Sequence, residues 1–329
     1  MVKIRFDGSE YELSEDRSVL DGLLDQGIRM PYSCKSGTCQ TCMVQADRDA
    51  GLDPKWQTGL KATDKARGYV LACQCRPVEG LALRSLALAD STLPAEIVEK
   101  RPLGAGVMAL HLRPLQDFTA FAGQYVTLFL GDGTGRSYSI ANIAAEDGFL
   151  ELHVRRIPGG RMSGWIHDDA AVGDRIMLRG PAGNCFYVNE AREEFPILLA
   201  GTGTGLAPLL GVARDALRQG HRGEITLIHG ALRTEDLYFR AELTALAAAH
   251  TNFRYVPCVL EAGERDDVTA GSLDQVALGF LGEPRATRVY FCGAPEMVAL
   301  LKRKAFLAGV ASRNIFSDPF IPTATAAAA

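Results

Sequence analysis

Cysteines near the N-terminus are the residues whose spacing most clearly indicates chemistry in this sequence. The 329 residues include eight cysteines, and Cys34, Cys39 and Cys42 follow the spacing C-x4-C-x2-C, with Cys73 further along the chain. This is the ligand spacing of a plant-type 2Fe–2S cluster. A tight loop would supply three thiolates to the two irons, and a distant segment the fourth. Gly37 lets the N–H groups of the loop turn toward the negatively charged sulfurs.

Two other interpretations of these cysteines are weaker. Structural zinc sites usually use two C-x2-4-C pairs, whereas a single residue separates Cys73 from Cys75. Unligated buried cysteines would leave the loop spacing unexplained. Cys75 is the alternative fourth ligand, but Cys73 is preferred because its context resembles the LxCQ context of the last ligand in plant-type ferredoxin domains. Cys185 and Cys258 match no motif, and we expect them to be packing residues.

A second group of residues could bind a flavin. In the segment Arg136-Ser-Tyr138-Ser139, the arginine can neutralise a phosphate, the tyrosine can stack on the isoalloxazine, and Ser139 can hydrogen-bond near N5. A glycine pair before Ser163 opens a short predicted helix whose free N–H groups suit a pyrophosphate. An arginine and a tyrosine in an ordinary strand are the alternative explanation. The candidate contacts in this region are Arg136, Tyr138, Ser139, Arg155, Gly160, Met162 and Ser163.

A glycine-rich loop follows the apolar strand PILLA and indicates a bound nucleotide. The loop comprises Gly201, Thr202, Gly203, Thr204 and Gly205, with Pro208 just beyond it. Its spacing is not G-x-G-x-x-G. Its place between a buried strand and a helix nevertheless suits a pyrophosphate, because glycines permit close main-chain approach and a helix N-terminus favours negative charge. A tight strand–helix turn without a ligand is the competing interpretation.

Three patterns of apolar residues predict the elements that position these motifs. Residues 1–85 show a hairpin signal at Asp7-Gly8 and a helix start at Ser18, which predicts a small α+β domain; its cysteine spacing resembles that of β-grasp-like ferredoxin domains. Residues 86–94 are expected to be a linker. Short strands separated by glycine and proline predict an antiparallel β-barrel flavin domain over residues 95–192. Buried strands alternating with helices predict an α/β parallel-sheet nucleotide domain over residues 193–322, and residues 323–329 a disordered tail.

The motifs together, in this order, resemble the NADH-dependent reductase components of bacterial multicomponent oxygenases. These are ferredoxin–NADP reductase-like proteins with a plant-type ferredoxin domain at the N-terminus, and the resemblance covers nearly the whole chain. It implies FAD in the barrel, with Arg136, Tyr138 and Ser139 as its principal contacts. The segment Cys292-Gly293-Ala-Pro295-Glu-Met297 resembles the family's C-G-x-P-x-M segment, whose cysteine lies beside the nicotinamide; a buried cysteine at a strand end is the alternative. Phe320 resembles the aromatic residue that lies near the flavin face in this family. Ordinary packing of its side chain on the sheet is the alternative explanation.

The cofactors imply an order of electron transfer. Hydride carries two electrons and a 2Fe–2S cluster accepts one, so a flavin that releases electrons singly must stand between NADH and the cluster. Ser139, Cys292 and Phe320 are the candidate catalytic residues. Arg233, after the second strand of the nucleotide domain, could bind the 2′-phosphate of NADPH or lie in solvent among acidic neighbours. The resemblance favours NADH, while the residues leave the choice open.

Composition narrows the function classes. The net charge of −4, from 35 basic and 39 acidic residues, gives no reason to expect nucleic-acid binding. No apolar run is long enough to span a membrane, and the N-terminus lacks the apolar core of a signal peptide. Neither H-E-x-x-H nor G-x-S-x-G occurs. We therefore expect a cytoplasmic, monomeric reductase without a membrane contact.

The expected partner follows from the resemblance. It is the terminal oxygenase component, or its ferredoxin, of a ring-hydroxylating dioxygenase or soluble monooxygenase, as in aromatic hydrocarbon catabolism. Two alternatives stay open. The same electron chain could serve a non-oxygenase acceptor such as a sugar-deoxygenation enzyme, or the protein could be a non-catalytic iron–sulfur redox sensor, against which the intact flavin and nucleotide motifs argue.

Overall fold

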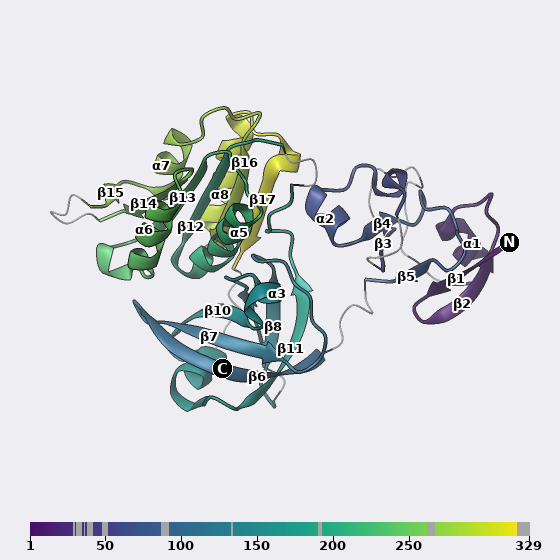
Figure 1. The fold of residues 1–329 in the computed structure, drawn as a ribbon, viewed down its shortest axis with the longest axis horizontal. Coiled ribbons are helices and arrows are strands. Elements are labelled where there is room, and N and C mark those ends of the chain that lie inside the picture. Colours follow the sequence, from purple (N-terminus) through teal and green to yellow (C-terminus); the bar gives the residue numbers. More distant parts are fainter. Residues whose placement is uncertain are drawn as a thin grey trace, which may run out of the picture. The chain divides into compact units, whose positions relative to one another are not determined.

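The computed structural model consists of two compact units, Met1–Ser91 and Thr92–Ala329 (Figure 1). It describes residues 1–28, 30, 35, 37, 42–47, 52–86, 92–132, 134–189, 193–261 and 267–320. Cys34, Cys39 and the tail 323–329 lie outside the described residues. No helix in the described part of the chain is long and apolar enough to cross a membrane.

The first unit is built on a five-stranded mixed sheet with the strand order β2-β1-β5-β3-β4. Its strands are β1 (Val2–Phe6), β2 (Ser9–Leu13), β3 (Met43–Ala46), β4 (Tyr69–Leu71) and β5 (Ala82–Arg84), and its helices are α1 (Val19–Asp25) and α2 (Ala62–Ala66). The predicted hairpin is confirmed, because β1 pairs antiparallel with β2. Asp7 and Gly8 take the positive φ angles of 50° and 83° that such a two-residue turn requires. Ser18 accepts a hydrogen bond from the Asp21 N–H at 3.1 Å and so caps α1.

The first part of the second unit is the predicted antiparallel barrel. Its strands are β6 (Thr92–Gly104), β7 (Val107–Pro114), β8 (Tyr125–Phe129), β9 (Gly135–Ser139), β10 (Leu150–Arg155) and β11 (Arg175–Ala182), and its helices are α3 (Ala144–Asp147) and α4 (Arg161–Gly164), the latter continued by a π-helical turn over Trp165–Asp169. The sheet order is β10-β7-β6-β11-β8-β9, and an antiparallel bridge between Ile140 and Leu152 joins its two edge segments. The bridge closes the sheet around an apolar core. Strand β6 begins at Thr92, inside the stretch expected to be a linker.

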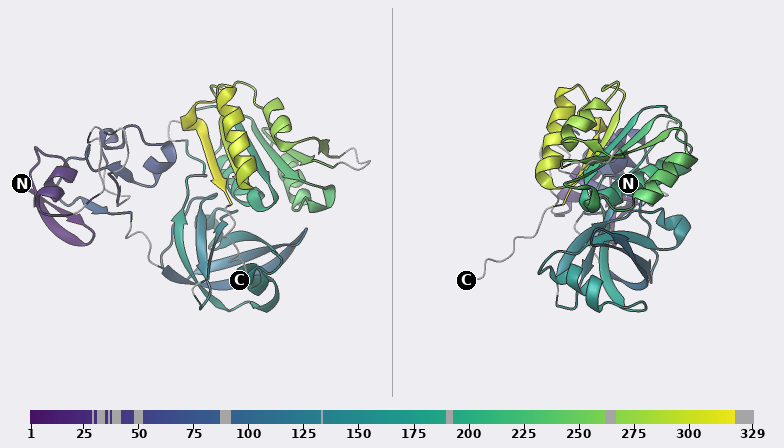
Figure 2. Two further views of the ribbon diagram at one scale, coloured as in Figure 1. Left: turned by 180° about the vertical axis from the view of Figure 1, so that it is seen from behind. Right: turned by 90° about the vertical axis from the view of Figure 1, so that its left-hand side faces the viewer.

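The second part of this unit is the predicted parallel α/β domain. Its strands are β12 (Ile197–Thr202), β13 (Ile225–Ala231), β14 (Phe253–Val259), β15 (Thr269–Ala270), β16 (Arg288–Gly293) and β17 (Ile315–Pro319), and its helices are α5 (Leu206–Arg218), α6 (Arg240–Ala249), α7 (Leu273–Gly279) and α8 (Pro295–Leu307). Helices α5 and α6 pack on one face of the sheet, and α7 and α8 on the other (Figure 2).

The strand order β15-β14-β13-β12-β16-β17 places a switch point between β12 and β16. The chain runs outward from β12 to one edge and then returns to the other side of β12. Ligands of open parallel sheets bind in the crevice outside the carboxyl ends of the strands at such a point. Both nucleotide motifs, the glycine-rich loop after β12 and the Cys292 segment at the end of β16, therefore lie where this topology places a ligand.

The barrel and the nucleotide domain pack closely through glycines. A Cβ at Gly211 of α5 would lie 2.7 Å from both the Gly123 nitrogen and the Ile140 carbonyl oxygen of the barrel, and one at Gly123 would lie 3.1 Å from the Pro208 carbonyl oxygen of α5. Phe121 and Phe186 stack beside this contact with ring centroids 4.4 Å apart. Residues from both domains can therefore form a single site.

Candidate cofactor sites

The two described cysteines of the predicted cluster, Cys42 and Cys73, lie together in the first unit. The Ala72 N–H donates to the Cys42 carbonyl at 3.0 Å. Burial raises the pKa of Cys42 to about 11, while a hydrogen bond from the Cys73 main chain acts in the other direction. The Gln74 side-chain amide approaches the Cys73 sulfur at 3.5 Å. Adjacent sulfurs with N–H donors beside them are the environment that an iron–sulfur cluster uses.

Cys75, the alternative fourth ligand, has a different environment. Its side chain is fully buried in the apolar core of the first unit, and burial raises its pKa to about 12. Its sulfur approaches the Arg76 carbonyl at 3.8 Å. The geometry therefore fits Cys73 as the ligand. The assignment of all four cysteines stays a prediction, because Cys34 and Cys39 lie outside the described residues.

Strand β9 carries the predicted flavin residues on alternate faces. Arg136 pairs with Leu128 and Tyr138 with Val126 of β8, so their side chains share one face while Ser139 points to the other. Burial raises the pKa of Tyr138. The Arg136 guanidinium donates to the Gly135 carbonyl at 2.6 Å, and among the described residues no carboxylate pairs with it. A cation and an aromatic ring on one barrel face fit the phosphate and ring system of a flavin.

The segment around α4 uses its small residues to shape a turn. The Ser163 hydroxyl accepts from the Ile157 N–H at 3.1 Å and donates to the Gly160 carbonyl at 3.3 Å. A Cβ at Gly160 would lie 2.6 Å from the Ser163 oxygen. The Met162 side chain is buried in the barrel core. These three residues therefore set the path of the main chain, and the segment would bind a phosphate through N–H groups rather than side chains.

Ser139 contacts an acidic residue that sequence reasoning did not single out. Its buried hydroxyl donates to Oδ2 of Asp318 at 3.0 Å, across 179 residues of sequence. Asp318 on β17 pairs in register with Cys292 on β16. Burial raises the pKa of Asp318 to about 6, although the hydrogen bond from Ser139 acts in the opposite direction. Burial also raises the pKa of Cys292, so this thiol is protonated at neutral pH. The flavin motif and the nicotinamide motif therefore meet at one point.

A second thiol lies beside Cys292. The sulfur of Cys185, in the segment after β11, is 3.3 Å from the Cys292 sulfur, and both residues are buried. Cys185 packs as expected from the sequence, but its packing partner is the candidate nicotinamide residue. The main-chain N–H of Phe320 donates to the Gly293 carbonyl at 2.8 Å, so Phe320 also lies next to this motif.

The loops after β12 and β16 are in main-chain contact. A Cβ at Gly205 would lie 2.4 Å from the Cys292 carbonyl oxygen, and one at Gly201 would lie 2.6 Å from the same atom. Gly293 has a φ of 121°, and a Cβ there would lie 2.7 Å from the Thr202 hydroxyl. Only glycine permits this approach, which forms the wall of the crevice. Behind it, Pro208 is buried in the first turn of α5, Pro295 begins α8, and Met297 packs against the core.

Gly203, beside the Thr204 of the same loop, faces an arginine from the barrel. Its φ is 54°, and the Arg155 guanidinium lies 3.5–3.9 Å from the position of its Cβ. Among the described residues no carboxylate pairs with Arg155. His229 is fully buried nearby, and burial lowers its pKa to about 3, although a main-chain contact with Gly203 acts in the other direction. An uncompensated cation beside a glycine loop fits a pyrophosphate.

Arg233, the residue that could bind a 2′-phosphate, is already paired. Its guanidinium donates to Glu261 at 3.0 Å, and its main-chain N–H donates to Asp236 at 3.3 Å. Glu261 lies two residues beyond the end of β14 at Val259. A 2′-phosphate near Arg233 would therefore face two carboxylates.

The fold and the site define a class of protein. A cysteine-loop domain, a closed antiparallel barrel and a parallel-sheet nucleotide domain are the parts of an electron-transfer flavoprotein with an iron–sulfur centre. Three family models match these parts in the same order: a 2Fe-2S iron-sulfur cluster binding domain over residues 4–78, an oxidoreductase FAD-binding domain over 95–187 and an oxidoreductase NAD-binding domain over 199–303.

Known proteins match along nearly the whole chain. The reductase subunit of an aromatic O-demethylase from Amycolatopsis sp. is 35% identical over 96% of this chain and 97% of its own. The ferredoxin–NAD(P)+ reductase component of the Pseudomonas putida naphthalene 1,2-dioxygenase system is 31% identical over 94% of this chain and 95% of its own. A CDP-6-deoxy-L-threo-D-glycero-4-hexulose-3-dehydrase reductase from Yersinia pestis is 28% identical over 98% of both. The crystal structure of an Amycolatopsis cytochrome P450 reductase superposes with a TM-score of 0.66 at 33% identity, covering 98% of this chain and 99% of that one.

The chain belongs to the ferredoxin–NADP reductase-like family whose members carry an N-terminal 2Fe–2S domain. It is an NAD(P)H-dependent flavin iron–sulfur reductase, and its cofactors are FAD, a 2Fe–2S cluster and a nicotinamide dinucleotide. The predicted fold class, recognition and cofactors are thereby confirmed.

Proposed function

We propose that this reductase passes electrons from NADH to the terminal oxygenase component, or the ferredoxin, of a multicomponent oxygenase. The contact between Ser139 of the barrel and Asp318 beside Cys292 carries the proposal, because it brings the flavin and nicotinamide motifs to one place. When bound, FAD accepts hydride from the nicotinamide and supplies electrons singly to the cluster. The protein's own task is to bind, orient and exclude water.

Two groups of residues would hold FAD. Arg136 offers a charge to the phosphates and Tyr138 a ring on the same face of β9. The turn shaped by Gly160, Met162 and Ser163 offers main-chain N–H groups. Ser139, on the opposite face of β9, would lie toward the reacting edge of the ring system, as its contact with Asp318 supports.

The nicotinamide dinucleotide would lie along the crevice between β12 and β16. The loop from Gly201 to Gly205 and the Arg155 guanidinium would hold the pyrophosphate, while Cys292 and Phe320 would border the nicotinamide. NADH is preferred over NADPH because Glu261 already compensates Arg233.

Asp318 and Ser139 would accept the proton that the overall oxidation of NADH releases. Hydride transfer carries the hydrogen and both electrons of NADH to the flavin, so this proton would be released only when the two electrons pass on to the cluster. With a pKa raised to about 6 by burial, the Asp318 carboxyl is largely ionised at neutral pH. Its Oδ2 can accept a proton through the Ser139 hydroxyl, with which it already shares a hydrogen bond.

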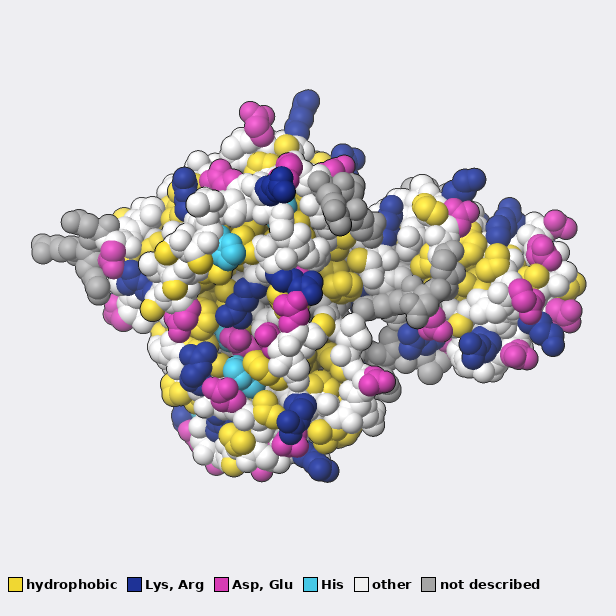
Figure 3. Space-filling view, viewed as in Figure 1, with side chains coloured by type: hydrophobic (Ala, Val, Ile, Leu, Met, Phe, Trp, Pro, Cys, Tyr) yellow, Lys and Arg dark blue, Asp and Glu magenta, His cyan; other side chains and the backbone are white. Residues whose placement is uncertain are grey.

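Similar proteins support the oxygenase partner. The aromatic O-demethylase and naphthalene dioxygenase reductases are parts of oxygenase systems by their names. The face drawn in Figure 3 intersperses basic and acidic side chains, so recognition there does not depend on one large field of a single sign. We propose that the protein is a monomer and that it is cytoplasmic. A reducing compartment suits the four cluster thiols, which are Cys34, Cys39, Cys42 and Cys73.

An anaerobic titration with NADH, followed by visible spectroscopy, tests this function. Flavin absorbance should bleach and cluster absorbance should then fall. A preparation that holds zinc, without iron or flavin, would overturn the cofactor assignments. Purified acceptors test the partner: a terminal oxygenase or its ferredoxin should be reduced much faster than a sugar dehydrase. Faster reduction of the sugar dehydrase would favour a non-oxygenase acceptor, the second candidate function. The similarity to the Yersinia pestis dehydrase reductase is the observation behind that candidate.

A further inference from the structure

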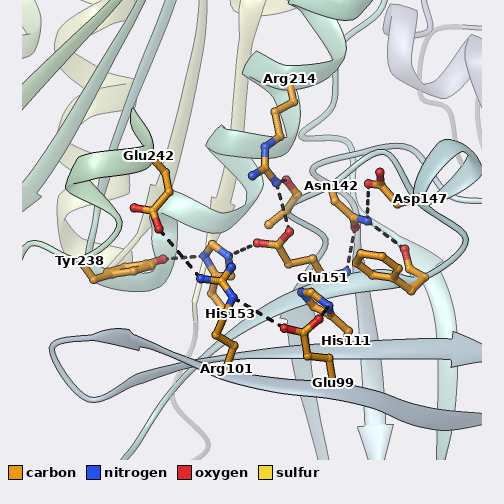
Figure 4. A network of polar contacts seen from close by, with 12 residues as sticks. Glu99, Arg101, His111, Asn142, Asp147, Glu151, His153, Arg214, Tyr238 and Glu242 are labelled. Atoms are coloured by element: carbon orange, nitrogen blue, oxygen red, sulfur yellow. Dashed lines mark hydrogen bonds and ion pairs between the residues drawn. The ribbon is translucent and has the colours of Figure 1, made fainter. Parts of the chain in front are cut away.

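Strand β10 presents three polar side chains in succession to the nucleotide domain. Glu151, His153 and Arg155 share one face of the strand by the alternation of side chains. Glu151 accepts from Arg214 of α5 at 3.2 Å. His153 contacts the Tyr238 hydroxyl at 2.9 Å, and Arg155 reaches Gly203. Figure 4 shows Tyr238, His153 and Glu151 joined in one line, with Arg214 meeting Glu151 from the α5 side.

The direction of each hydrogen bond in this line follows from its charges. Burial would raise the pKa of Glu151, but the hydrogen bond with His153 and the charge of Arg214 bring it to about 2, so the carboxylate only accepts. Nε2 of His153, 2.8 Å from Glu151 Oε1, must then carry the proton. Burial lowers the pKa of His153, so the imidazole is neutral and its Nδ1 is an acceptor. The Tyr238 hydroxyl therefore donates to Nδ1.

Tyr238 stands at a constrained turn in the nucleotide domain. Its neighbour Phe239 has a φ of 61°, a left-handed conformation that is rare for a bulky residue. This turn sets the start of helix α6 at Arg240. The Tyr238 ring lies edge-on to His229, with centroids 5.4 Å apart. The line from Glu151 thus continues to the histidine beside the glycine loop.

The line resembles a hydroxyl–histidine–carboxylate triad in its connections but not in its chemistry. Burial raises the pKa of Tyr238 far above its usual range. The side chain is also closed to substrate, with only 2% of the residue exposed. A neutral phenol that substrate cannot reach is not a nucleophile. The hydrogen bond of Tyr238 therefore has a structural role, which is to hold the two domains in position.

We propose that Glu151, His153 and Tyr238 form a clamp between the barrel and the nucleotide domain that sets Arg155 over the glycine loop. His153 and Tyr238 are then positioning residues for the dinucleotide, although neither touches it. Arg155 is on the same strand as His153, and the loop it faces is on the same domain as Tyr238, so the clamp fixes their separation. The inference rests on the proposed function, which places the pyrophosphate at Gly203 and Arg155.

The molecule supplies a matched control for the clamp. Tyr187 and His221 form a second buried tyrosine–histidine pair at 3.0 Å, and His221 Nε2 donates to the Phe195 carbonyl at 2.9 Å. Nδ1 therefore accepts from the tyrosine, as in the clamp. This pair lies at the amino end of β12, whereas the nucleotide crevice is at the carboxyl end.

The experiment compares Tyr238→Phe with Tyr187→Phe in the purified holoenzyme. Both variants lose one buried hydrogen bond, and both should melt a few degrees lower with FAD content unchanged. Calorimetric titration with NAD⁺, and with ADP-ribose, which lacks the nicotinamide, should give a Kd about tenfold higher for Tyr238→Phe and unchanged for Tyr187→Phe, an effect of about 1.4 kcal/mol. Equal Kd values for the two variants would overturn the clamp.

Arg155→Ala separates the clamp from the proposed function. If Tyr238 acts through Arg155, Tyr238→Phe should raise the Kd tenfold in the parent protein and leave it unchanged in the Arg155→Ala background. Additive effects would overturn positioning through Arg155. An Arg155→Ala variant that binds NAD⁺ and ADP-ribose as the parent does would instead overturn the pyrophosphate assignment of the proposed function.

Discussion

Replacing Asp318 with asparagine tests the electrostatic cost of the site. The amide keeps the shape of the carboxyl and can still accept the hydrogen bond from Ser139, but it never ionises. Burial raises the pKa of Asp318 from 3.8 to about 6 in the folded protein. At about 1.4 kcal/mol per pH unit of displacement, the ionised carboxylate costs the fold about 3 kcal/mol at pH 8.

The sign of the pH dependence follows from linkage. The folded state binds the Asp318 proton more tightly than the unfolded state, so stability is greatest below pH 3.8 and falls as the pH rises toward 6. Above about pH 6 the full cost is present. Integrating between the two pKa values, the destabilisation grows from about 1.6 kcal/mol at pH 5 to about 3 kcal/mol at pH 8. The variant should therefore be more stable than the parent, by an amount that grows by about 1.4 kcal/mol over this range.

Urea unfolding of the holoenzyme at pH 5 and pH 8, followed by far-UV circular dichroism, measures this difference. Asp274→Asn is the control of opposite sign, because the hydrogen bond from Lys304 lowers the pKa of Asp274, and its loss should destabilise the protein at pH 8. Asp318→Asn should also slow electron transfer from the reduced flavin to the cluster in stopped flow without changing the Kd for NAD⁺. A variant less stable than the parent at pH 8, or a gain independent of pH, would refute the assigned burial cost.

Three further changes separate structure from binding and catalysis. Gly205→Ala would place a Cβ 2.4 Å from a carbonyl oxygen and should lower stability by about 1–3 kcal/mol in thermal unfolding. At Gly203 a Cβ meets no atom closer than 3.5 Å, but the φ of 54° is left-handed, so Gly203→Ala should lower stability by about 1–2 kcal/mol and also weaken NAD⁺ binding; an unchanged Kd for NAD⁺ in Gly203→Ala would contradict the loop geometry. Glu261→Gln frees Arg233 and should raise kcat/KM for NADPH relative to NADH severalfold, and an unchanged ratio would place the 2′-phosphate elsewhere. Cys73→Ser should abolish cluster absorbance while NADH still bleaches the flavin; a retained cluster spectrum would show that another ligand is used.

Local patterns predicted the parts of the site that are local in structure. The glycine loop after β12 and the Cys292 segment after β16 were recognisable because each combines a buried strand with residues that permit close main-chain approach. The sheet order then brings them together, with Gly201 opposite Cys292. A parallel sheet with a switch point requires this, so the crevice itself follows from the strand pattern.

Contacts between distant segments could not be predicted in the same way. Asp318 is 179 residues from Ser139, and Cys185 is 107 residues from Cys292, so no short motif contains either pair. The only signal for Asp318 was a lone acidic residue in the strand Ile315–Pro319. The start of helix α6 at Arg240 follows the left-handed conformation of Phe239, next to the Tyr238 hydroxyl that contacts His153 of the barrel.

Buried polar groups are hydrogen-bonded differently in the clamp (Glu151, His153 and Tyr238) and in the candidate nucleotide crevice. Glu151 and His153 are buried, but each side chain is hydrogen-bonded, so they hold the barrel and the nucleotide domain together without the cost of an unpaired polar group. Asp318 keeps a raised pKa despite its hydrogen bond with Ser139, and the pKa of His229 is lowered to about 3 by burial despite its main-chain contact with Gly203. Groups that burial penalises in this way destabilise a fold, and they persist where a ligand or a reaction uses them. Their positions, one beside Cys292 and one beside Gly203, correspond to the nicotinamide and pyrophosphate ends of the same crevice.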